Sequence, residues 1–178
     1  MQRAEVTLDE VMGFREIKAI EQRKMLEYKT DGIVVALGMN IPGPVKSGPS
    51  IKEAFQQGKD KLDKIILQQK GTVLQKSEFE RKAGYAVIYL VFGIDKWVLK
   101  KETVYLEESH PLGRIFDIDV IGEDAVAITR EMVYAKRRSC LLCEQDAKVC
   151  GRSRNHSVKE LQDKVLEIIE LWKAGKML

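Results

Sequence analysis

The stretch GRIFDIDVI, residues 113–121, places two aspartates inside an otherwise apolar run. Because side chains of a strand alternate between its two faces, Asp117 and Asp119 are predicted to lie side by side on one face, with apolar residues on the other. An unpaired carboxylate among buried side chains costs several kcal/mol. The stretch therefore predicts a strand that packs on one face and whose acidic face meets a water-filled cleft, a cation or arginines.

On both sides of this strand, apolar periodicity predicts alternating helices and strands. Helices are predicted over residues 7–29, 50–71, 95–109 and from 157 onward, and strands over 32–37, 72–75 and 85–92. A turn at Gly122-Glu123-Asp124 is predicted to lead the aspartate strand into residues 125–129 as a hairpin. The sequence thus predicts a single α+β domain, residues 1–178, with a mixed sheet that contains this hairpin and is flanked by about four helices.

The helix predictions depend on start signals and on apolar stripes. Three helices are predicted to begin at capping boxes, namely Thr7 to Glu10, Ser50 to Glu53 and Ser157 to Glu160. The predicted buried stripe of the first helix is Val11, Phe14, Ile17 and Ile20, and that of the 95–109 helix is Val98, Lys101, Val104 and Glu108. The latter stripe favours a helix only slightly over a strand.

Composition excludes several classes of protein. Of 178 residues, 44% are hydrophobic and 32% are charged, which is ordinary for one globular domain and too polar for a membrane span. The first ten residues have no basic and apolar signal sequence, and three cysteines cannot all pair within the chain, so a cytoplasmic location is expected. The net charge is only +3, but residues 130–159 carry eight Lys or Arg against three acids, a local excess that would attract phosphate.

Four stretches, in this order, carry a family resemblance: NIPGPVK (40–46), HPLGRIFDIDVI (110–121), RRSCLLC (137–143) and CGRSRNHS (150–157). With them the chain resembles the citrate lyase holo-acyl-carrier-protein synthases, also called apo-citrate lyase phosphoribosyl-dephospho-CoA transferases. The resemblance implies transfer of a 2'-(5-phosphoribosyl)-3'-dephospho-CoA group from its 5-triphosphate donor, triphosphoribosyl-dephospho-CoA. The acceptor is a serine of the acyl carrier (gamma) subunit of citrate lyase, and diphosphate leaves.

This chemistry gives the aspartates a role. Attack of a hydroxyl on the α-phosphorus of a triphosphate requires charge neutralisation, which nucleotidyltransferases supply with carboxylate-held Mg²⁺. We therefore expect Asp117 and Asp119 to be catalytic Mg²⁺ ligands on a catalytic hairpin in a nucleotidyltransferase-like fold. Such sites commonly add a Gly-Ser pair, which is missing before Asp117, and a third acid, for which Glu131 is the nearest candidate. Otherwise, the two acids could lie on an exposed face or pair with arginines.

The resemblance also suggests residues that bind the donor or the carrier. Gly113 would let backbone N–H groups approach phosphate, and Arg114 would clamp a phosphate oxygen. Arg152 and Arg154 alternate with small residues in GRSRNH, which predicts that they lie on one side of an extended loop facing the donor. Each of these residues could instead be a turn glycine or a solvated arginine.

Two further candidates lie outside these groups. His110 precedes the aspartate strand and could act as a base toward the carrier serine, although a lone histidine is more often structural. Residues 38–50, GMNIPGPVKSGPS, hold three prolines and three glycines and predict a rigid loop. This loop could frame the pantetheine arm or dock the carrier, with Lys46 toward phosphate, or it could be only a connector.

A different class of function rests on Cys140-x2-Cys143-x6-Cys150-x5-His156. The spacing is compatible with a Cys3His zinc site, and three buried thiols without metal fit it as well. With zinc, the basic loop could be a binding module for RNA or an acidic protein, without catalysis. Against nucleic acid, residues 135–156 contain no Phe, Tyr or Trp for stacking, and two acids would repel phosphate. We therefore rank this alternative second and expect neither nucleic acid nor membrane as a partner.

Overall fold

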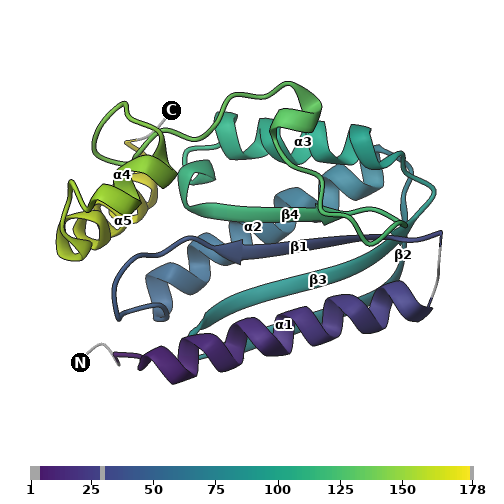
Figure 1. Cartoon of the computed structure of the whole chain (residues 1–178), viewed down its shortest axis with the longest axis horizontal. Helices are drawn as coiled ribbons and strands as arrows, with labels where there is room; N and C mark the ends of the chain where they lie inside the picture. The colour runs from purple at the N-terminus through teal and green to yellow at the C-terminus, as the bar shows by residue number, and fades with distance from the viewer. Residues whose placement is uncertain (1–4, 29–30, 177–178) are drawn as a thin grey trace.

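The computed structural model of the protein describes residues 5–28 and 31–176. The helices and strands alternate along the chain (Figure 1). They are α1 (Leu8–Tyr28), β1 (Ile33–Met39), α2 (Pro49–Gln68), β2 (Thr72–Arg81), β3 (Gly84–Phe92), α3 (Lys96–Ser109), η1 (Gly113–Ile115), β4 (Phe116–Ile121), η2 (Glu131–Val133), α4 (Ala147–Ser153) and α5 (Val158–Lys173), η marking a 3-10 turn. The described residues thus contain five α-helices, one more than expected. None of the described helices is both long and apolar enough to cross a membrane.

The four strands form one sheet in the order β2-β3-β1-β4. Every neighbouring pair is antiparallel, so the predicted mixed sheet is wrong. β4 pairs with β1, in a register that sets Asp119 opposite Ala36 and Asp117 opposite Gly38. The acidic pair therefore lies on an edge strand.

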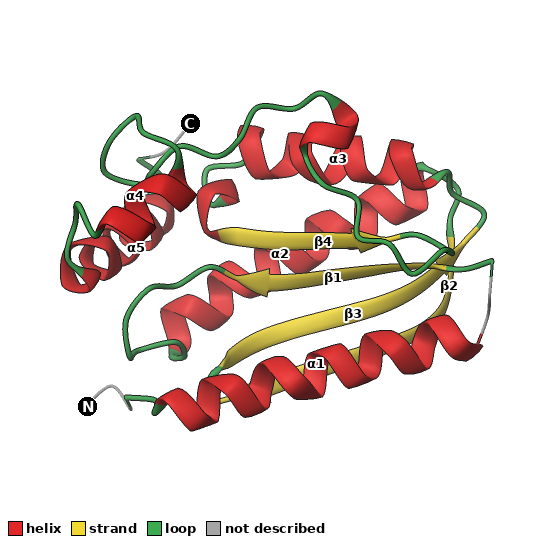
Figure 2. Cartoon of the chain, viewed as in Figure 1, coloured by secondary structure: helices red, strands yellow, loops and turns green. Residues whose placement is uncertain are grey.

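The predicted hairpin is wrong beyond its turn. Gly122 donates its N–H to the carbonyl of Val126 at 3.0 Å, and Ile128 donates its N–H to the carbonyl of Val120 at 2.8 Å. These two bonds flank a single antiparallel bridge, Ile121 to Ala127, and no strand continues beyond it. The second arm stops there because Glu107 and Lys100 of α3 bind the N–H and the carbonyl of Ile118, the next residue on the free edge of β4. Residues 122–146 instead lead back along β4 to α4 with little regular structure (Figure 2).

Helices cover both faces of the sheet (Figures 1 and 2). α1 covers one face, where Met25 packs against the even-numbered residues of β1 and β3. α2, α3 and α5 enclose the larger core on the other face, with Leu37, Tyr89 and Phe116 fully buried in it. α4 and α5 gather at the end of the sheet where β1 finishes and β4 begins.

The capping box of α1 is confirmed, but its predicted stripe is only partly right. Glu10 and Thr7 exchange the two predicted hydrogen bonds, at 2.8 and 3.2 Å. Phe14 is buried, whereas Ile17 and Ile20 are exposed. The helix is rotated so that Met25 reaches the sheet and Glu21 accepts a hydrogen bond from Ser77 on β2 at 2.6 Å.

The other predicted helix starts differ in accuracy. The capping box at Ser157 and Glu160 is confirmed for α5. For α2 it is wrong: Gly48 is the N-cap, at φ 144°, and Ser50 instead donates to Glu170 at 3.2 Å. Proline at the first helical position explains the earlier start, because its fixed φ suits that position. The basic segment predicted as a loop contains the additional helix, α4.

Candidate active site

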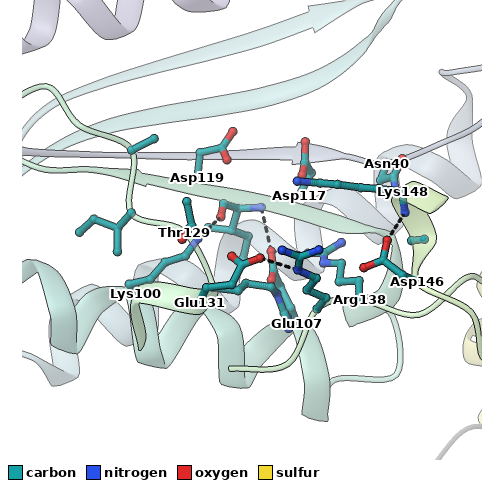
Figure 3. A pocket seen from close by; sticks show the side chains of 16 residues that line it. Asn40, Lys100, Glu107, Asp117, Asp119, Thr129, Glu131, Arg138, Asp146 and Lys148 are labelled. Carbon is teal, nitrogen blue, oxygen red and sulfur yellow. Dashed lines mark hydrogen bonds and ion pairs between the residues drawn. The ribbon is translucent and has the colours of Figure 1, made fainter. Parts of the chain in front are cut away.

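A cleft of about 530 Å³ opens beside β4 (Figure 3). Its lining comes from β4, from α3, from residues 127–131 and from the start of α4. Asp117 and Asp119 both line it and point to the same side of their strand, as the alternation predicted (Figure 3). Residues that are distant in sequence therefore line the same cleft as the acidic pair.

Neither aspartate is neutralised by a contact within the described residues. No hydrogen bond or ion pair joins the carboxylate of Asp117 or Asp119 to another group there. Burial and the charge of Asp117 raise the pKa of Asp119, while the charges of Lys100 and Lys18 act in the opposite direction. Their neighbours across β1, Ala36 and Gly38, are small, and the Nζ of Lys18 from α1 lies 3.7 Å from where a Cβ of Gly38 would stand. Two adjacent carboxylates without partners form a fitting site for a cation, because oxygen ligands are those that Mg²⁺ prefers.

The free edge of β4 is covered by side chains rather than by a strand. Glu107 accepts a hydrogen bond from the N–H of Ile118 at 3.0 Å, and Lys100 donates to the Ile118 carbonyl at 3.2 Å. Arg138 donates to the carbonyl of Phe116 at 2.9 Å. These three side chains satisfy backbone groups that an edge strand would otherwise leave unpaired.

Glu107 is the buried centre of this arrangement. It is 4% exposed and forms ion pairs with Arg130 at 3.0 Å and with Arg138 at 2.5 Å. Lys100 is 5% exposed, and burial lowers its pKa. Sequence reasoning missed all four of these residues. The spacing of Lys100 and Glu107 places them on one face of α3, and this spacing could have indicated two of these residues. The predicted buried stripe was one position away from that face.

The remaining charges of the cleft are largely paired. Glu131, the candidate third acid, lines the cleft but accepts a hydrogen bond from Arg137 at 2.8 Å. Asp146 also lines it and caps α4 by accepting the N–H groups of Lys148 and Val149. Among the described residues, no third carboxylate clusters with both aspartates closely enough to form a three-ligand metal site.

A second cleft, of about 500 Å³, adjoins the first and shares Asn40, Arg138 and Ala147 with it. Arg114 and Arg154 line the second cleft. Arg114 donates to the carbonyl of Ser139. The two clefts are therefore neighbours, one lined by the acidic pair and the other by Arg114 and Arg154.

The predicted extended loop carrying Arg152 and Arg154 is wrong. Arg152 lies within α4, and Arg154 is its C-cap in the left-handed conformation, at φ 51°. Residues two apart on a helix face in different directions, so the pair does not share one side. Arg154 lines the second cleft, whereas Arg152 lines neither.

The other predicted binding residues have structural contacts of their own. Gly113 donates its N–H to the carbonyl of His110 at 2.7 Å, so this N–H does not face a phosphate. His110 accepts the N–H of Leu112 through Nδ1 at 3.0 Å, and burial lowers its pKa. Lys46 donates to the carbonyl of Ile41 at 2.6 Å. These three residues line neither cleft.

The predicted cysteine and histidine set is brought together by the fold. The ligand atoms of Cys140, Cys143, Cys150 and His156 all lie within 4.8 Å of one another. Three of these residues, Cys140, Cys150 and His156, also line the second cleft. The cluster therefore lies next to the candidate active site and not within it.

Comparison with known proteins shows which family the chain is similar to. Residues 6–172 match the family model described as apo-citrate lyase phosphoribosyl-dephospho-CoA transferase. A relative from Streptococcus pyogenes serotype M5 (strain Manfredo), named "Probable apo-citrate lyase phosphoribosyl-dephospho-CoA transferase", is 30% identical over 92% of this chain and 85% of its own. A relative with the same name from Vibrio cholerae serotype O1 (strain M66-2) is 31% identical over 92% of this chain and 91% of its own.

Proposed function

The chain belongs to the apo-citrate lyase phosphoribosyl-dephospho-CoA transferase family, and from this premise we propose how its clefts perform the transfer. The donor is triphosphoribosyl-dephospho-CoA, and the acceptor is a serine hydroxyl of the citrate lyase acyl carrier subunit. The donor's triphosphate lies beside Asp117 and Asp119, and the fold acts in the manner of a nucleotidyltransferase.

The observation that carries this proposal is the pair of unpartnered carboxylates in the cleft. Asp117 and Asp119 would together hold Mg²⁺, and their lack of protein partners and the raised pKa of Asp119 fit that role. When bound, the ion would neutralise charge on the phosphates and on the leaving diphosphate. Both side chains are exposed, so an ion held between them would also be open to the donor and to water.

The protein's own residues position the donor. Lys148 lines the cleft and offers positive charge to phosphate oxygens, while Arg137 is paired with Glu131, and Arg130 and Arg138 are held by Glu107. Fixed charges aimed at the reacting group stabilise the charge that develops during transfer. The rest of the donor extends into the second cleft, toward Arg114 and Arg154.

The reaction forms one bond and breaks another. The serine oxygen of the carrier bonds to the α-phosphorus, the bond from that phosphorus to the bridging oxygen of the β-phosphate breaks, and diphosphate leaves. The serine proton passes to solvent or to a cleft carboxylate. His110 is not assigned this role, because its Nδ1 accepts the Leu112 N–H and the residue lines neither cleft.

The test measures the carrier itself. The protein, authentic donor, apo acyl carrier subunit and Mg²⁺ are incubated together, and the intact mass of the carrier and the released diphosphate are measured. We expect one phosphoribosyl-dephospho-CoA group per carrier and an equal amount of diphosphate. If a folded preparation yields no mass gain, the proposal is wrong. A binding module without catalysis, the alternative from sequence, is not favoured by the family membership.

A further inference from the structure

We propose that Cys140, Cys143, Cys150 and His156 bind one structural zinc ion. Their ligand atoms all lie within 4.8 Å of one another. The Sγ atoms of Cys140 and Cys150 are 3.5 Å apart, and those of Cys143 and Cys150 are 4.0 Å apart. Zinc bonds to sulfur of about 2.3 Å in a tetrahedron place two sulfurs about 3.8 Å apart. The observed separations lie on either side of that value.

The ligands come from three separate pieces of backbone. Cys140 and Cys143 belong to a turn that is closed by the bridge from Ser139 to Asp146. Cys150 lies in α4, and His156 follows that helix. Three segments that converge on one point, each bringing metal-ligating atoms, are the arrangement expected of a structural zinc site.

The histidine supplies an independent observation. Its Nε2 is buried and has no hydrogen-bond partner. A buried polar atom without a partner costs free energy, and few such atoms occur in native proteins. A bond from Nε2 of His156 to zinc would give this atom the partner that it lacks in the protein.

The turn at Cys140 has the backbone contact expected around a thiolate. Leu142 donates its N–H to the Sγ of Cys140 at 3.5 Å. Such donors stabilise negative charge on sulfur and orient the ligand. A disulfide does not explain the cluster, because bonded sulfurs lie about 2.05 Å apart and three cysteines leave one thiol over.

A zinc ion here would fix one wall of the second cleft. Three of its ligands line that cleft, as do Arg114 and Arg154. Arg114 donates to the carbonyl of Ser139, the residue before the first ligand. The ion would thereby hold the basic surface in place without touching the acidic pair, and the inference is independent of the proposed transfer reaction.

The test uses the full chain purified without a polyhistidine tag from zinc-supplemented cells. Elemental analysis should find about one equivalent of zinc. Less than about a tenth of an equivalent, with three thiols titrating after denaturation, overturns the proposal, as does a mass that shows a disulfide.

The two histidines of the chain provide a matched pair of variants. His156→Asn and Cys143→Ser should retain less than about a tenth of the wild-type zinc, while His110→Asn should retain all of it. Equal zinc in all of these proteins would mean adventitious binding and overturn the site. If the ligand variants do not fold, the wild-type protein exchanged with Co²⁺ decides. A visible spectrum of tetrahedral, thiolate-bound cobalt supports the site, and an octahedral spectrum excludes it.

Discussion

The Glu107 carboxylate accepts the N–H of Ile118 at 3.0 Å, in the place where a neighbouring strand would otherwise offer a carbonyl. The same carboxylate neutralises Arg130 and Arg138, which line the cleft. One buried side chain thus completes the edge of the sheet and fixes two positive charges near the acidic pair.

Glu107→Gln should destabilise the fold by about 3 kcal/mol, because it leaves two guanidinium groups without their buried countercharge. Its neighbour provides the control. Glu108 is about half exposed and pairs only with Arg130, so Glu108→Gln should cost less than about 1 kcal/mol. Urea denaturation of both variants measures the difference, and equal losses would show that Glu107 does not have the central role described.

Asp117→Asn and Asp119→Asn should each reduce turnover by about a hundredfold or more, because each removes a charge from the proposed Mg²⁺ ligands with little change in volume. Asp124→Asn, in the turn after β4, should retain normal turnover. Rates are followed by the carrier mass assay, with circular dichroism to confirm folding. Near-normal rates in the first two variants would leave the acids without a catalytic role.

Asp119→Asn should also change the thermal stability of the protein, in the opposite direction to Asp124→Asn. Burial and Asp117 raise the pKa of Asp119, so its ionised form costs stability, and this cost appears as pH rises above the usual Asp range. Asp119→Asn should therefore raise Tm at pH 7 in magnesium-free buffer. The N–H of Val126 and then Lys96 lower the pKa of Asp124, so Asp124→Asn should lower Tm. Both differences should shrink toward about pH 4. A lower Tm for Asp119→Asn at pH 7 would contradict this account.

Gly113→Ala should destabilise the protein by about 2 kcal/mol, because the new Cβ would lie 2.4 Å from the backbone oxygen of Glu107. The control is Gly13→Ala within α1, where a Cβ meets nothing within 4 Å. That variant should gain about 0.5 to 1 kcal/mol from higher helix propensity. Thermal denaturation distinguishes them, and a neutral Gly113→Ala would mean that the turn before β4 can shift.

Arg154 and Arg152 should differ in their effect on donor binding, although sequence reasoning grouped them. Arg154→Gln should weaken binding of triphosphoribosyl-dephospho-CoA about tenfold, the effect of losing one hydrogen bond between charged groups. Arg152→Gln should change it less than about twofold, since Arg152 lines neither cleft. Calorimetric titration without carrier measures both, and equal losses would place the donor elsewhere.

The parts of the fold with strong local signals were predictable. The buried strands β1 and β3 and the capping boxes of α1 and α5 follow from residues close together in sequence. The alternation in β4 placed both aspartates on one face, as the structure has them. The antiparallel pairing of β4 with β1 was not predictable, because the two strands are distant in sequence and no local pattern indicates their register.

The site was predictable only in part, for the same reason. Its acids lie within one short stretch, whereas Lys100, Glu107 and Arg138 reach β4 from other elements. The rotation of α3 about its axis decides which of its polar residues are buried. The predicted buried stripe was one position away from the observed one, so Glu107 was not predicted to be buried. Packing against other parts of the fold, rather than the local sequence pattern, determines how a helix is rotated.

The segment after β4 is built differently from the sheet that carries the acids. Between residues 122 and 157 only η2 and α4 are regular, and the segment's hydrogen bonds are mostly within turns. Amide protons of the inner strands β1 and β3 are therefore expected to exchange with solvent only when the whole molecule unfolds, and those of this segment through local opening. The aspartates lie at the edge of the slowly exchanging part of the protein, whereas the cleft walls that residues 127–148 contribute belong to the part that opens first.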